Sequence, residues 1–134
     1  MHKLPIERPK PTLDDQHLQR LSEEASVEAA EEFATDYVVL LPRRVERIVR
    51  NVSVRDRDMA MDASLSLKST SWLAGALRMN QLCRELELAI ALADWAAAVS
   101  LTQEITLHLP RLQNAIADRP RPALTASPKP ASRR

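Results

Sequence analysis

The sequence feature that most constrains the fold is the spacing of the apolar residues, which recur every three or four positions through most of the chain. This spacing lines one face of an α-helix, whereas a half-buried strand needs strict alternation. The clearest stripe consists of Trp95, Ala98, Thr102, Ile105, Leu109, Leu112 and Ile116. Hydrophobic residues make up 45% of the chain but aromatic residues only 3%, a composition that favours helices over sheets. The sequence therefore predicts an all-α fold.

The same spacing predicts four long helices and a short one at the N-terminal end. We expect them near 13–25, near 27–53, from an N-cap at Asp56 or Asp58 to about residue 73, at about 77–92, and from Trp95 onward. Pro42 and Pro110 should kink the helices that contain them. Because short links force neighbouring helices to run antiparallel, we predict an up-down four-helix bundle with a short N-terminal capping helix.

The two ends of the chain differ in composition from the middle. Seven of the nine prolines lie in residues 1–13 and 119–134, and both segments are basic, whereas residues 14–118 carry a net charge of −6. Pro/Arg/Ser/Lys-rich segments bury too little apolar area to fold. We therefore predict a flexible basic tail over 1–13, one domain over 14–118, and a disordered tail over 119–134. The acidic domain gives no reason to expect a nucleic-acid partner.

Several function classes are excluded by residue counts. Gly75 is the single glycine, so the glycine-rich loops that bind nucleotides cannot form. One cysteine, Cys83, excludes an internal disulfide, and no Cys/His pair has metal-ligand spacing. We find no convergent nucleophile and base, and expect no enzyme activity, small-molecule substrate, metal or cofactor. Without a signal-peptide core or a membrane-length apolar run, we expect a cytoplasmic protein with no membrane contact.

The pattern breaks in residues 62–76, DASLSLKSTSWLAGA, where Leu65 and Leu67 stand two apart. Residues two apart on a helix point in nearly opposite directions, so one leucine must be exposed. With Leu67 inside, the inner face consists of Ala60, Ala63, Leu67, Thr70 or Ser71, and Ala74. The outer face then carries Leu65, Lys68, Ser69 and Trp72. This outer face is either a protein-docking patch or is covered by the short first helix or a tail.

The segment resembles the signature helix of histidine-containing phosphotransfer (HPt) domains, A-H-x-L-K-G-x-[SA]-x-x-x-G-A, whose histidine accepts a phosphoryl group. The matching residues are Leu67, Lys68, Gly75 and Ala76. FATDYVVLLPRRVERI is similar to the family's preceding helix with its central proline, Asp58 stands where a Gly-Asp turn caps the family's helix, and LCRELELAI with the later Asp94-Trp95 is similar to the next helix and turn. The resemblance spans 14–118 and implies a phosphorelay module with protein partners.

The sequence departs from the family at its centre. Leu65 stands in place of the phosphoaccepting histidine, and Ser69 replaces the following glycine. An aliphatic side chain offers no nucleophilic nitrogen, so residue 65 cannot carry phosphate. Aliphatic residues in an LSLKSxS context are typical of actinobacterial HPt-like proteins, so the resemblance implies a pseudo-HPt domain. We expect His17 and His108 to be surface or half-buried residues that do not take over the role.

Two functions follow from the sequence. In the first, the domain docks a response-regulator receiver domain or a histidine kinase through Leu65, Lys68, Ser69 and Trp72, without accepting phosphate. In the second, the domain is a structural or oligomerisation bundle that pairs with a second copy through the Leu65/Trp72 face. We expect a monomer or a weak dimer.

Overall fold

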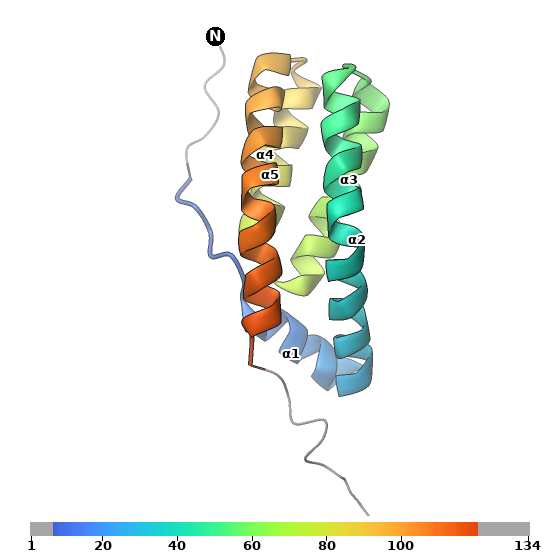
Figure 1. Ribbon diagram of the computed structural model, residues 1–134, viewed down its shortest axis with the longest axis vertical. Helices are drawn as coiled ribbons and strands as arrows, with labels where there is room; N and C mark the ends of the chain where they lie inside the picture. Colours follow the sequence, from blue (N-terminus) through green and yellow to red (C-terminus); the bar gives the residue numbers. More distant parts are fainter. Residues whose placement is uncertain (1–6, 121–134) are drawn as a thin grey trace, which may run out of the picture.

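The computed structural model describes residues 7–120, and these form five α-helices and no strand. The helices are α1 (Asp15–Glu24), α2 (Val27–Ser53), α3 (Arg57–Ala74), α4 (Leu77–Ala91) and α5 (Trp95–Asp118). The four long helices stand side by side, and α1 lies across one end of them (Figure 1). The predicted all-α bundle with a short N-terminal capping helix is confirmed.

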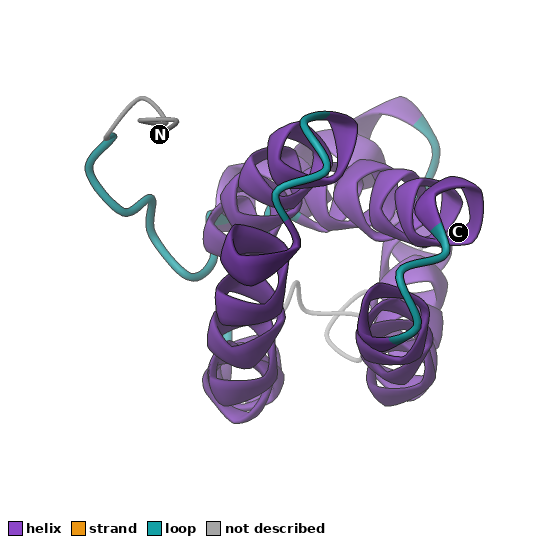
Figure 2. Cartoon of the chain, turned by 90° about the horizontal axis from the view of Figure 1, so that it is seen from above, coloured by secondary structure: helices purple, strands orange, loops and turns teal. Residues whose placement is uncertain are grey.

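The long helices close into a ring. Each packs against its neighbour in sequence, and α5 packs against α2. Figure 2 shows the bundle from above. The largest side chains at the centre are Tyr37, Leu41, Ile48, Leu67, Met79, Leu82, Leu86, Ile90, Ile105 and Leu112. Every long helix contributes to this single core, so α3 is held in a fixed position by its neighbours.

The helix starts are set by side chains that accept hydrogen bonds from free backbone N–H groups. Asp56, rather than Asp58, caps α3: its carboxylate accepts a bond from the Met59 N–H at 3.0 Å. Ser26 caps α2 and Asp94 caps α5 in the same way. The sequence could not decide between Asp56 and Asp58 as the N-cap because aspartate is favoured at this position in either case. The structure shows that Asp56 is the N-cap.

Gly75 ends α3 with a φ of 78°, a left-handed conformation that glycine adopts without strain. Its carbonyl oxygen accepts a hydrogen bond from the Asp14 N–H at 2.8 Å. A Cβ at residue 75 would overlap the Asp14 carbonyl oxygen and crowd the His17 side chain. The single glycine therefore has two tasks: it ends α3 and it lets the start of α1 approach closely.

Residues 7–13, which the sequence placed in a flexible tail, lie against α4 and are held there. The Arg78 N–H donates to the Pro11 carbonyl at 2.9 Å. The buried Gln81 side chain accepts from the Lys10 N–H and donates to the Arg8 carbonyl, each at 2.9 Å. A buried amide on α4 thus supplies hydrogen-bond partners that residues 7–13 lack by themselves. Residues 1–6 lie outside the described residues.

Arg119, the first residue of the predicted C-terminal tail, follows the end of α5 and contacts the bundle. Arg119 is 9% exposed, and its guanidinium donates to the Ile116 carbonyl and to the Glu31 carboxylate, each at 2.7 Å. This buried ion pair ties the end of α5 to the start of α2, so Arg119 belongs to the bundle. The remainder of the predicted disordered tail, 121–134, lies outside the described residues.

Candidate functional site

The inner face of α3 is sealed in the core. Ala60, Ala63, Leu67 and Ala74 are at most 3% exposed. Ser71, not Thr70, completes this face, and its hydroxyl forms a 2.6 Å hydrogen bond with the Tyr37 hydroxyl. Ser64 is also fully buried, and its hydroxyl donates to the Cys83 carbonyl at 3.1 Å. The predicted inward position of Leu67 is confirmed.

The outer face of α3, defined here as Leu65, Lys68, Ser69 and Trp72, is partly open to solvent. Leu65 is 41% exposed and Trp72 is 52% exposed, and Ser69 is exposed between them. Large apolar side chains held outward on a rigid helix are typical of protein-binding surfaces. The outward positions of Leu65 and Trp72 agree with the sequence, while their role in docking stays a prediction.

Lys68 is the member of the outer face that differs most from expectation. Its ammonium nitrogen lies 2.8 Å from the Glu87 carboxylate on α4, and both side chains are about three-quarters buried. Lys68 is therefore not a free cation on the surface, and its charge is largely offset inside this chain. Sequence spacing could not identify Glu87 as the partner, because no local pattern sets the register of α3 against α4.

Trp72 contacts α1 without being covered by it. The His17 ring meets the Trp72 ring edge-on with 4.6 Å between centroids, and His17 Nδ1 lies 2.8 Å from the Trp72 carbonyl oxygen. His17 is half-buried, as expected. The alternative in which the first helix or a tail covers the outer face thus applies to one edge of Trp72.

A cavity of about 560 Å³ opens beside Trp72 and extends the outer face toward α4. The N-terminal segment, α1, the end of α3 and the start of α4 each contribute to its walls. It is lined by Lys10, Asp14, His17, Trp72, Leu77, Asn80 and Arg84. The N-terminal segment that the sequence called a tail therefore forms one wall of the hollow next to Trp72.

Residue 65 is a leucine, whose aliphatic side chain has no nucleophilic atom. The nearest carboxylate in sequence to Ser66, that of Asp62, is held by Arg47 at 2.7 Å on the α2 side.

Burial raises the pKa of the Cys83 thiol to about 12, so this cysteine stays protonated and unreactive. Within residues 7–120, no cluster of three or more potential metal ligands occurs.

His108 lies on the opposite side of the bundle and is 8% exposed, so the expectation of a surface or half-buried residue is wrong here. It borders a hollow of about 370 Å³ with Arg78 and Arg111. Burial, and then the charges of these two arginines, lower the pKa of His108. His108 lies on the face of α5 that packs against α4, so its burial depends on how the two helices pack.

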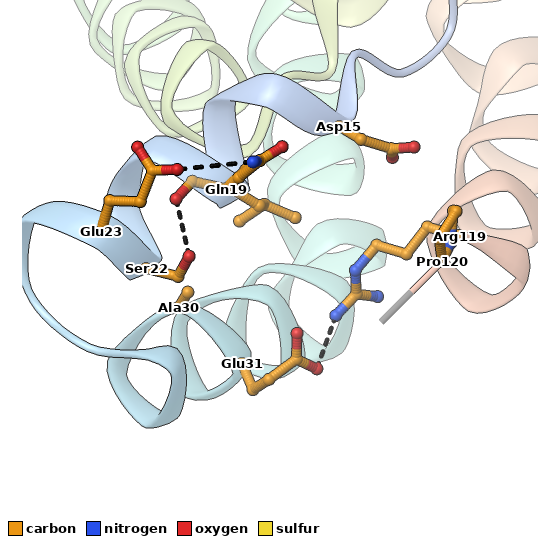
Figure 3. A pocket seen from close by; sticks show the side chains of 9 residues that line it. Asp15, Gln19, Ser22, Glu23, Ala30, Glu31, Arg119 and Pro120 are labelled. Carbon is orange, nitrogen blue, oxygen red and sulfur yellow. Dashed lines mark hydrogen bonds and ion pairs between the residues drawn. The ribbon is translucent and has the colours of Figure 1, made fainter. Parts of the chain in front are cut away.

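Another cavity, of about 510 Å³, lies between α1, the start of α2 and the end of α5. Figure 3 shows Arg119 reaching across it to Glu31, while Asp15, Gln19 and Glu23 line the side formed by α1. Because the only cation among the lining residues is already paired with Glu31, we interpret the cavity as the junction where α1 closes the bundle end.

The comparisons with known proteins support the fold. The sequence matches no protein-family model, and no curated protein matches it. The structure is similar to the crystal structure of histidine-containing phosphotransfer protein B (HptB) from Pseudomonas aeruginosa PAO1, with a TM-score of 0.73. The two chains are 20% identical, and the match covers 80% of this chain and 92% of that chain. This chain therefore has an HPt-like helical-bundle fold.

Hydropathy adds one finding about the described helices. In residues 7–120, none combines the length and the apolar character that crossing a bilayer requires.

Proposed function

We propose that this chain is a pseudo-HPt module of a two-component phosphorelay, of the actinobacterial type. It docks a receiver domain or a histidine kinase through the outer face of α3 and carries no phosphate at residue 65. It acts by binding, and we assign it no enzymatic reaction, cofactor or small-molecule substrate. The HPt-like fold supports the class of module. Because fold similarity alone does not define a function, the docking role rests on the residues of the outer face.

Leu65 is the observation that carries the proposal. This leucine is 41% exposed at the position where the sequence resembles the phosphoaccepting histidine. An exposed leucine on a stable bundle can contact a partner protein, but its side chain has no lone pair with which to attack an acyl phosphate. The surface is thus suited to binding and not to transfer.

Phosphotransfer tests the chemical half of the proposal. Purified chain incubated with a phosphorylated receiver should yield no acid-labile phosphoprotein. Leu65→His alone should accept phosphate slowly, because Ser69 crowds the place of the family's glycine. Leu65→His combined with Ser69→Gly should be faster. Acid-labile phosphate on His17 or His108 of the unchanged chain would contradict the proposal, and equal rates for the two variants would remove the crowding argument.

Partner capture tests the docking half. A pull-down from a lysate of the source organism should retain a receiver domain or a histidine kinase, identified by mass spectrometry. Leu65→Arg should abolish capture because it places a charge in the apolar contact. The matched control is Leu107→Arg, since Leu107 is 76% exposed on α5 and its charge should leave capture intact. Equal loss in both variants would contradict a role for the outer face.

Oligomeric state separates docking from self-pairing. Mass in solution at micromolar concentration should be that of a monomer if the outer face serves another protein. A dimer that Leu65→Arg splits and Leu107→Arg preserves would favour the structural bundle that pairs through Leu65 and Trp72.

A further inference from the structure

Two side-chain contacts show the register of α2 against α3. Arg47 on α2 pairs with Asp62 on α3 at 2.7 Å, and the Tyr37 and Ser71 hydroxyls lie 2.6 Å apart. The helices run antiparallel, and these contacts are separated by ten residues on α2 and nine on α3. Residues 43 and 44 of α2 therefore lie level with residues 65 and 66 of α3.

Both of these α2 residues are arginines. Arg43 is exposed and Arg44 is half-buried. Arg44 stands seven residues after Tyr37, so it lies on the same side of α2 as the tyrosine that reaches α3. The position corresponding to the phosphoacceptor thus lies level with two arginines of α2, of which Arg44 is on the side of α2 that faces α3.

These arginines differ from two neighbouring cations, Lys68 and Arg47, in the ion pairs that they form. Lys68 is paired with Glu87 on the α4 side, and Arg47 is paired with Asp62. Arg43 and Arg44, by contrast, make no ion pair with any of residues 7–120. The positive charge that an incoming anion would meet near Leu65 therefore comes from α2 and not from the lysine of the sequence motif.

We propose that Arg43 and Arg44 make the outer face bind the phosphorylated form of a receiver more tightly than the unphosphorylated form. This inference rests on the proposed function, because it needs a receiver docked over Leu65. The module would then detect an aspartyl phosphate that it cannot accept.

The chemistry of the two groups supports this preference. A phosphoryl group carries close to two negative charges and three strong acceptor oxygens. The planar guanidinium matches these oxygens with two parallel N–H donors, which gives both charge and geometry. No bond to phosphorus forms or breaks, since Leu65 has no nucleophilic atom, so the acyl phosphate stays on the receiver. Because Arg43 is exposed, salt should weaken the preference.

The test measures affinity for two forms of one receiver. Each receiver retained in the pull-down is titrated against the chain as the unmodified protein and as its beryllofluoride adduct, which mimics the aspartyl phosphate. We expect the adduct to bind about tenfold more tightly, the size of one charge-assisted hydrogen bond. Arg43→Gln/Arg44→Gln should reduce the ratio of the two affinities to about one, whereas Arg111→Gln, which removes one positive charge on α5, should preserve it. Thermal unfolding of each variant confirms that it is folded.

The outcomes distinguish this inference from the proposed function. Equal affinity for both forms in the unchanged chain, with binding still lost in Leu65→Arg, overturns the inference and leaves the docking function standing. A preference that survives Arg43→Gln/Arg44→Gln overturns the assignment to these arginines. Capture of a histidine kinase without any receiver overturns the inference and leaves the docking function standing, and failure to retain either partner overturns both.

Discussion

The inner and outer faces of α3 each carry a leucine and at least one serine, and they differ in what surrounds these side chains. The leucines are Leu67 inside and Leu65 outside. The inner serines have partners in neighbouring helices, as Ser71 has in Tyr37, whereas Ser69 is exposed. A hydroxyl group can be buried at small cost in free energy only where it forms a hydrogen bond with another buried group. The comparison teaches that the identity of a side chain does not decide its role, and the register of the neighbouring helices does.

The largest effect should separate the two leucines. Leu67→Ala removes a fully buried side chain and should lower the free energy of unfolding by about 2–5 kcal/mol through the cavity it leaves. Leu65→Ala should lower it by less than about 1 kcal/mol, because Leu65 is 41% exposed and its truncation leaves no enclosed cavity. Denaturant unfolding followed by circular dichroism measures both. Equal costs would mean that Leu65 is a core residue and that the docking assignment is wrong.

Trp72 should show the reverse pattern, with a large effect on binding and a small one on stability. Trp72→Ala should weaken partner binding by more than about tenfold, since buried tryptophans dominate interface energies. Its loss in unfolding free energy should stay below about 1 kcal/mol, the scale of one edge-to-face ring contact. Calorimetric titration and thermal unfolding of the same sample give the two numbers. A domain that unfolds on this change would show that Trp72 is structural.

Ser71 tests the inner face through its polar contact. Ser71→Ala leaves the buried Tyr37 hydroxyl without its partner and should cost about 1–2 kcal/mol in the free energy of unfolding. Adding Tyr37→Phe should cost less than the sum of the single changes, because both members of one hydrogen bond are then gone. Denaturant unfolding of the two single variants and the double variant closes this cycle. Additive costs would show that the bond contributes nothing.

The smallest effect should come from His108, a buried polar group far from the outer face. Its pKa is lowered from the ordinary 6.5 by burial and by Arg78 and Arg111. Between the lowered pKa and 6.5, the unfolded chain binds a proton that the folded chain does not, so stability falls as the pH drops below about 6.5. Unfolding measured from pH 7.5 to 5 should show this slope, and His108→Gln should flatten it. An unchanged slope in the variant would assign it to other groups.

Local periodicity was sufficient to predict much of the fold. The five helices, the cap at Gly75 and the inward side of Leu67 all depend on residues within a few positions of each other, where the geometry of the α-helix relates sequence to direction. The outward position of Leu65 follows from the same rule. The resemblance to HPt domains added the expected function, which the fold comparison supports only at the level of architecture.

What the sequence alone determined is therefore which residues form each helix and which side of α3 faces the core. The tertiary structure alone decided the partners: Glu87 for Lys68, His17 for Trp72, Glu31 for Arg119, and Gln81 for the N-terminal segment. Each of these contacts joins residues on different elements. Their pairing depends on the register and packing of whole helices, which many small core contacts set together and which no local period encodes.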